Sequence, residues 1–348
     1  MSRMKIQQTL FGKTPDGTPV ELFTLANGAG MVVKLASYGA TITELHVPDR
    51  HGETADVALG FAELGPYLRT HPYLGCMVGR VVNRIRGAAF SYRGKTYTLT
   101  PNDGLNAIHG GPQGMARRVW KAAARQSADN PAVEFVYESP DGEEGFPGNL
   151  RVTVVYSLRA RNTLRIDMLA RTDQPTPVNL ANHNYFNLHG AGNGTILDHE
   201  LFIPADYYTP SDSQLVATGE IRSVAGTPFD FTRPTPIGRR MGEIPPGYDC
   251  NFVLRQGPDP LHLAARLHEV QTARILEVYT TQPGVQLYTG NFLDGGIQGI
   301  GGAYPQHSGV CLETQHFPNA VHHPHFPTIM LAPGEEYRHA FEYRFSTN

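Results

Sequence analysis

A short polar segment, residues 179–187, interrupts apolar sequence with four asparagines and one histidine. In a strand, successive side chains point to opposite faces, so His183, Tyr185 and Asn187 share one face. Histidine suits proton transfer near neutral pH, because its ordinary pKa is about 6.5. Burying polar groups without partners costs free energy. The segment therefore predicts either a hydrogen-bonded bulge in the core or part of a functional site.

A second candidate is a carboxylate inside an apolar strand, Glu313 in residues 309–315. Alternation places Cys311 and Glu313 on the face opposite Val310 and Leu312. A glutamate in this setting is paired with an arginine, is functional, or both. As a proton acceptor, it would gain from a partly desolvated pocket that raises its pKa toward neutrality.

Two weaker polar insertions lie earlier in the chain. In residues 106–111, His109 precedes a glycine pair, which lets the backbone approach a ligand closely but also simply makes turns. In residues 79–85, Arg84 follows Asn83. A guanidinium beside an amide suits sugar hydroxyls or carboxylates, and is equally common at a solvated strand edge.

Histidines also gather at residues 322–325, with His316 upstream, but Pro324 interrupts the group and no cysteine or carboxylate ligand is close by. We therefore expect no metal and no other cofactor.

The chain has three cysteines, Cys76, Cys250 and Cys311, which are odd in number and far apart. They have neither zinc nor disulfide spacing, so we predict buried free thiols in a reducing compartment.

The elements that must position these residues are predicted to be strands. Gly and Pro make up about 18% of the chain against a usual ~12%, which indicates many turns between short strands. Residues 90–99 alternate around Gly94 as a hairpin, and residues 150–158 and 164–168 form a longer one. Helix signals are missing, and residues 295–302 read as a loop. Further strands are expected at 31–35, 41–47, 57–61, 133–138, 201–204, 284–289 and 337–345, with 261–270 and 275–281 as a strand pair.

Composition limits the class of protein. The 348 residues carry 29 Lys+Arg against 32 Asp+Glu, a net charge of −3, which lacks the basic footprint of a nucleic-acid or anionic-membrane binder. No apolar run reaches the ~18 residues of a membrane span, and no signal peptide is evident. We expect a soluble, cytoplasmic protein with a single domain over residues 1–348, all-β, as one large antiparallel sandwich.

Seven segments together resemble the aldose 1-epimerase (galactose mutarotase) family. They occur in family order from about residue 20 to the C-terminus: 79–85 (GRVVNRI), 106–111 (NAIHGG), 182–188 (NHNYFNL), 247–249 (GYD), 280–293 (TTQPGVQLYTGNFL), 307–315 (HSGVCLETQ) and 333–335 (PGE). Any one of these motifs is weak, and seven in order are very specific. The resemblance implies a large antiparallel β-supersandwich, in agreement with the strand pattern.

The resemblance also implies roles for the polar residues. Glu313 is expected to be the general base and His183 the general acid. The sugar pocket is expected to be lined by Asn83, Arg84, His109, Asp249 and Gln286, with Tyr185 beside His183. The substrate is then a small aldose, such as glucose or galactose, handled by a monomer or homodimer.

The implied reaction, mutarotation, interconverts the α and β anomers of a free sugar through the open-chain aldehyde, for which one acid and one base suffice. On this assignment the carboxylate governs the acid limb of the pH profile and the imidazole the alkaline limb. Direct contact with Arg84 would lower the pKa of Glu313, so we expect Arg84 to bind hydroxyls instead, or to hold the glutamate only at an angle.

Three other functions compete with mutarotation. A hexose-6-phosphate 1-epimerase should place further basic residues at a phosphate end, and the motifs hold few. A non-catalytic sugar-binding module would not need both Glu313 and His183. A glycosidase would want two carboxylates, whereas the motifs offer a histidine in the place of the acid.

Overall fold

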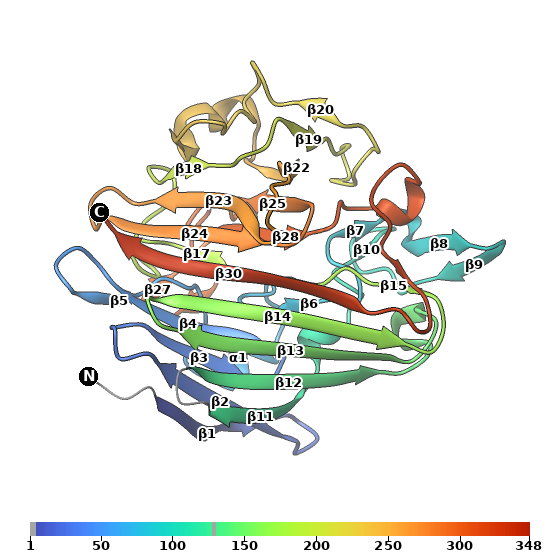
Figure 1. Cartoon of the computed structure of the whole chain (residues 1–348), viewed down its shortest axis with the longest axis horizontal. Helices are drawn as coiled ribbons and strands as arrows, with labels where there is room; N and C mark the ends of the chain where they lie inside the picture. The colour runs from blue at the N-terminus through green and yellow to red at the C-terminus, as the bar shows by residue number, and fades with distance from the viewer. Residues whose placement is uncertain (1–4, 127–129) are drawn as a thin grey trace.

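The computed structural model describes residues 5–126 and 130–348, and β-strands dominate it. The largest sheet has nine antiparallel strands in the order β11-β12-β13-β14-β30-β24-β23-β18-β21. Figure 1 looks onto this sheet, with β12, β13, β14, β30 and β24 side by side. Its strands are β11 Lys121–Gln126, β12 Pro131–Ser139, β13 Leu150–Arg159, β14 Thr163–Thr172, β18 Glu200–Phe202, β21 Thr235–Pro236, β23 His262–His268, β24 Arg274–Thr280 and β30 Tyr337–Thr347.

Two further sheets complete the main architecture. A five-stranded sheet follows chain order and contains β1 Lys5–Lys13, β2 Pro19–Ala26, β3 Val32–Ala36, β4 Thr41–Pro48 and β5 Thr54–Asp56. A six-stranded sheet, in the order β17-β28-β25-β22-β19-β20, contains β17 Tyr185–Phe186, β19 Tyr207–Thr209, β20 Arg222–Ser223, β22 Asp249–Val253, β25 Gly284–Tyr288 and β28 Val310–Gln315.

The remaining elements are short. Two-residue strands pair as β6 Met77–Val78 with β16 Ala181–Asn182, β7 Arg84–Ile85 with β10 Ala107–Ile108, β15 Thr176–Pro177 with β29 Met330–Leu331, and β26 Gln298–Gly299 with β27 Gly302–Ala303; β8 Ala89–Tyr92 pairs with β9 Lys95–Thr98. The α-helix α1 spans Leu64–Tyr67. The 3₁₀ turns are η1 Arg86–Ala88, η2 Met115–Arg117, η3 Glu143–Gly145, η4 Ile237–Glu243 and η5 Ala320–His322.

Alternating burial explains why these sequences form sheets. In β13 and β14 every second residue is buried, and the buried sets of the two strands face the same core. The main hydrophobic cluster joins side chains of all three large sheets, among them Phe23 of β2, Tyr156 of β13 and Leu312 of β28. The core therefore lies between the nine-stranded sheet and the other two, which is the expected antiparallel sandwich.

Most predicted strands are confirmed, including the hairpin of residues 90–99, where Arg93 and Gly94 both adopt positive φ in the turn. The strand pair at 261–270 and 275–281 is β23 with β24. The strand expected at 57–61 is wrong. The chain there makes a single bridge, from Ala58 to Phe186, because its amides alternate between Leu45 of one sheet and Tyr185 of another. The loop expected at 295–302 contains the short β26 and the start of β27. Over the described residues, no helix is long and apolar enough to cross a membrane.

Candidate active site

Seven of the eight predicted site residues line one cavity. Gln286 does not line this cavity. The lining residues are Pro72, Tyr73, Asn83, Arg84, Ile108, His109, His183, Tyr185, Asp249, Tyr288, Phe292 and Glu313.

One face of the six-stranded sheet supplies the carboxylates of the cavity. Glu313 of β28 lies opposite Gln286 of β25, and Asp249 of β22 lies opposite Tyr288 of β25. Their neighbours along the strands, such as Leu287 and Leu312, point into the main core. The two-residue period of these strands therefore separates the polar face from the apolar one, as the sequence predicts for Glu313.

Asn83 and His109, which flank the β7–β10 pair, and Tyr73 from an earlier loop also line the cavity and have strained backbones. Tyr73, Asn83 and His109 have φ values of 59°, 63° and 52°, a region that residues other than glycine rarely adopt. Beyond His109, a Cβ on Gly110 would lie 1.9 Å from the carbonyl oxygen of Gly79. Only glycine permits this approach, so the glycine pair has a structural reason for following His109.

His183 and Glu313 meet inside the cavity. His183 Nε2 lies 3.7 Å from Glu313 Oε1, and the two residues are only 5% and 2% exposed. Glu313 Oε2 is buried without a hydrogen-bond partner in the described part of the chain. An acid–base pair is thus held next to an open volume, with one carboxylate oxygen left for a ligand.

Burial shifts the pKa values of this pair in opposite directions. Desolvation raises the pKa of Glu313 well above its usual range, and the charge of Asp249 raises it further. Desolvation lowers the pKa of His183 to about 4. A raised glutamate pKa agrees with the expectation from sequence. The order of the two values is the reverse of the expected one, because burial disfavours the charged form of each group.

Arg84 does not pair with Glu313. Its Nε donates to Asp103 Oδ2 at 2.6 Å, and its Nη1 lies 3.6 Å from Asp249 Oδ2. The Arg84 charge still opposes the rise in the pKa of Glu313, but less than burial promotes it. The expectation that the arginine avoids direct contact with the base therefore agrees with the geometry.

Gln286 lies behind Asp249, to whose Oδ1 its side-chain amide donates at 2.6 Å. Its own Oε1 is buried without a partner among the described residues. In this arrangement Gln286 orients the carboxylate that faces the cavity. Direct contact between Gln286 and a sugar stays a prediction.

Sequence reasoning predicted Tyr185 beside His183 but missed that Tyr288 and Phe292 extend it into an aromatic wall. The ring of Tyr185 packs 5.1 Å from that of His183 and 5.9 Å from that of Tyr288, and Phe292 continues the row 6.2 Å further out, with 63% of its surface exposed. Tyr288 could have been predicted from the sequence, because it lies two residues after Gln286 in the same strand and therefore shares its face. The wall suits the C–H face of a small polar ligand.

The histidines near the C-terminal end have protein partners. His322 Nδ1 contacts the side chain of Asn319, His323 Nε2 contacts Ala217 O, and His325 Nε2 contacts Gly219 O. These bonds attach the segment to residues 217–219. That these histidines bind no metal stays a prediction.

Comparison with known proteins gives a consistent picture. The family model described as aldose 1-epimerase matches residues 21–344. The chain is 47% identical to galactose mutarotase of Sus scrofa over 99% of both chains, and 46% identical to that of Homo sapiens over 98% of both. It is 38% identical to aldose 1-epimerase of Escherichia coli, covering 95% of this chain and 96% of the other. Its fold matches the crystal structure of galactose 1-epimerase from Lactobacillus acidophilus with a TM-score of 0.88 and 29% identity over 99% of both chains.

Proposed function

The chain belongs to the aldose 1-epimerase family and is a mutarotase, and we propose that Glu313 and His183 are the base and the acid of its reaction. As a mutarotase it interconverts the α and β anomers of free hexoses such as galactose and glucose. The observation that carries the assignment is the 3.7 Å approach of His183 Nε2 to Glu313 Oε1 inside a cavity. We further propose that the whole chain acts as one domain, since its main core joins residues from Phe23 to Phe345.

The proposed mechanism needs two proton transfers at neighbouring oxygen atoms. Glu313 removes the proton of the C1 hydroxyl while His183 donates one to the ring oxygen, and the C1–O5 bond breaks to give the aldehyde. Rotation about C1–C2 and reversal of both transfers gives the other anomer. Because the hydroxyl and ring oxygens are bonded to the same carbon, a closely spaced acid and base can serve both.

One proton shared by the pair is enough for the cycle. Ionised Glu313 with protonated His183 opens the ring, and protonated Glu313 with neutral His183 closes it. The raised pKa of Glu313 and the lowered pKa of His183 favour the second state in the empty cavity. The enzyme therefore rests in the state that captures the open-chain sugar, and proton transfer between the two groups restores the state that opens the ring.

The remaining lining residues are proposed to bind the sugar hydroxyls. Asp249 accepts hydrogen bonds, Arg84 and Asn83 donate them, and His109 closes the wall beside His183, with ring centroids 5.0 Å apart. Among the described lining residues, Arg84 is the one permanent cation, and Asp103 and Asp249 already engage it. This charge balance supports an unphosphorylated sugar over a hexose phosphate.

The three buried free cysteines support a reducing, cytoplasmic location.

Polarimetry of freshly dissolved α-glucose and α-galactose tests the function. The protein should accelerate the decay of optical rotation to the same final value as the uncatalysed reaction. α-Glucose 6-phosphate provides the contrasting arm. A larger kcat/KM on the phosphate ester than on both free sugars would replace the free-sugar assignment by a hexose-6-phosphate 1-epimerase.

A further inference from the structure

A cluster of metal-ligating side chains lies on the five-stranded sheet, away from the sugar cavity. Glu44 and His46 are alternate residues of β4 and share a face, and Asp56 of β5 lies directly opposite His46. One ligand atom from each residue lies within 4.8 Å of the others. None of the three lines the sugar cavity, so the mechanism does not use them.

The Asp56 carboxylate is held in place with one oxygen left over. Its Oδ1 accepts hydrogen bonds from the amides of Leu45, at 2.8 Å, and Ala58, at 3.1 Å. Its Oδ2 is buried and has no partner in the described part of the chain, and the residue is only 9% exposed. A buried carboxylate oxygen without a partner is rare and calls for an ion or a water. The backbone bonds to Oδ1 are the outer-shell support that metal-binding carboxylates have.

We propose that Glu44, His46 and Asp56 bind one divalent transition-metal ion, of which Zn²⁺ is the representative. An imidazole with two carboxylates is a nitrogen–oxygen donor set that Zn²⁺ accepts, with a water completing four ligands. His46 Nε2 and Glu44 Oε2 are now 2.7 Å apart. A tetrahedral zinc ion separates neighbouring ligand atoms by about 3.4 Å, so a small side-chain shift admits it.

A cation at this place would displace the proton that His46 shares with Glu44. Once His46 is neutral, the two carboxylates and the nearby ammonium of Lys34 leave one excess negative charge. Lys34 Nζ lies 2.9 Å from Glu44 Oε1, whereas Glu44 Oε2 faces His46 Nε2, so the ion would enter between these last two atoms. The lysine side chain is 32% exposed, so it can turn toward solvent. The bound ion would fasten β5, the short edge strand, to β4.

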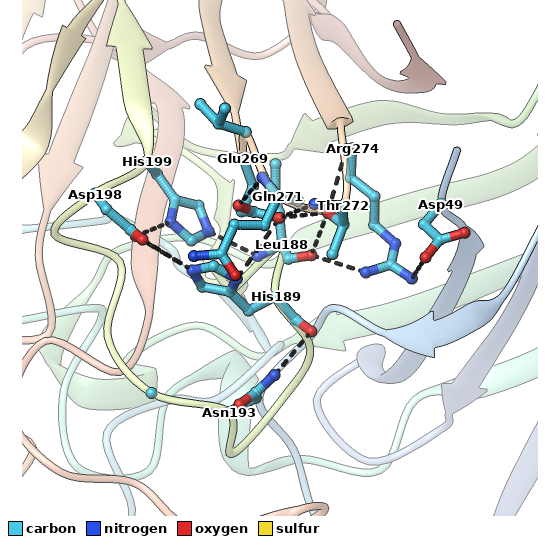
Figure 2. A network of polar contacts seen from close by, with 12 residues as sticks. Asp49, Leu188, His189, Asn193, Asp198, His199, Glu269, Gln271, Thr272 and Arg274 are labelled. Atoms are coloured by element: carbon cyan, nitrogen blue, oxygen red, sulfur yellow. Dashed lines mark hydrogen bonds and ion pairs between the residues drawn. The ribbon is translucent and has the colours of Figure 1, made fainter. Parts of the chain in front are cut away.

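A second cluster shows why geometry alone does not make such a site. Figure 2 shows His189 and His199 turned toward the Asp198 carboxylate. One ligand atom from each of these residues lies within 4.8 Å of the others, as in the first cluster. The amide of Leu188 donates to His199 Nε2 at 3.0 Å, so the proton of the neutral ring is on Nδ1, next to Asp198. Binding a metal at Nδ1 would require an imidazolate or the loss of that bond. This cluster is therefore the matched negative control.

Calorimetric titration of the EDTA-dialysed full chain with Zn²⁺ at pH 7.5 tests the proposal. We expect one site per chain, with affinity at least tenfold weaker in His46→Ala and Asp56→Asn. The second variant keeps an Oδ1 acceptor for Leu45 and Ala58 but replaces the ligating oxygen by an amide nitrogen. Lys34→Met should bind more tightly than wild type, and His189→Gln should bind like wild type. A Zn²⁺-dependent rise in Tm should follow the same order.

Absence of a stoichiometric site, or binding that persists in His46→Ala and disappears in His189→Gln, would overturn the proposal. If Asp56→Asn does not fold, His46→Ala still decides, because that side chain is 30% exposed. Absorption of Co²⁺ substituted at the site adds a direct readout, with a d–d spectrum of nitrogen–oxygen coordination that His46→Ala loses. Mutarotation should be the same with and without EDTA, so the outcome is independent of the proposed catalytic pair.

Discussion

Glu313 combines burial, a raised pKa and an unpartnered oxygen at the position where the proposed mechanism requires a proton acceptor. Glu313→Gln keeps the size of the side chain and removes the basic oxygen. We expect kcat for mutarotation to fall at least ~10²-fold, since general acid–base groups contribute about 10²–10⁴-fold. Polarimetry measures kcat, and circular dichroism controls for folding. Near-normal turnover in a folded variant would refute Glu313 as the base.

The two histidines of the cavity should separate by kinetics. His183 faces Glu313, whereas His109 Nδ1 accepts a hydrogen bond from the amide of Asn83 at 3.3 Å and is held as part of the wall. His183→Asn should lower kcat by about 10²-fold or more, and His109→Asn should mainly raise KM. Steady-state polarimetry on both variants gives the two constants. The opposite pattern would exchange their roles.

The pH profile should reflect the reversed order of the pKa values. The active pair carries one proton. Below about pH 4 the pair gains a second proton, which binds to His183. At high pH the pair loses its single proton from Glu313. kcat/KM should therefore show an acid limb near pH 4, lost in the residual activity of His183→Asn, and an alkaline limb lost in that of Glu313→Gln. An acid limb near pH 6.5 that survives in His183→Asn would contradict this order.

At the scale of elements, the β7–β10 pair depends on a close backbone approach at Gly110. Gly110 has φ of 84°, and a Cβ there would lie 1.9 Å from the carbonyl oxygen of Gly79. Gly104 also has positive φ, 59°, but a Cβ there meets nothing within 4 Å. Gly110→Ala should destabilise the fold by more than ~2 kcal/mol and raise KM, because His109 moves. Gly104→Ala should cost only about 1 kcal/mol. Urea unfolding compares the two, and equal losses would show that the clash is relieved.

At the scale of the whole molecule, buried histidines should make the fold sensitive to acid. Desolvation lowers the pKa of eight histidines: to about 3 in His71 and His316, to about 4 in His183, His199 and His339, well below the usual value in His109, and also below it in His322 and His323. Below pH 6.5 the unfolded chain binds more protons than the native one. Stability is therefore lost as the pH falls from 6.5 toward 4, by about 1.4 kcal/mol per histidine and pH unit.

Raised carboxyl pKa values, such as that of Asp56 at about 6, act in the opposite direction and offset part of this loss. We expect Tm to fall by roughly 10 °C from pH 7 to pH 5. His316→Gln should flatten that slope, and substitution of the exposed His51 by Gln should leave it unchanged. Differential scanning calorimetry checks this, and a Tm independent of pH over the range would show that these histidines are not desolvated.

Strand periodicity is a local property, and for that reason much of the sheet arrangement is readable along the chain. Alternation alone placed Cys311 and Glu313 opposite Val310 and Leu312, and the turn at Gly94 placed the hairpin around it. The family motifs in order were enough to name seven residues that line the cavity. The strand predicted at residues 57–61 is wrong because the hydrogen-bond partners of its amides lie in two different sheets.

Properties that depend on neighbours distant in the chain required the folded molecule. Residues from Tyr73 to Glu313 meet in one cavity, Arg84 binds Asp103 and Asp249, and Gln286 lies behind the carboxylate. The order of the pKa values of His183 and Glu313 also depends on neighbours distant in the chain. Desolvation sums the exclusion of water by side chains of many strands, and no spacing along the sequence encodes that sum.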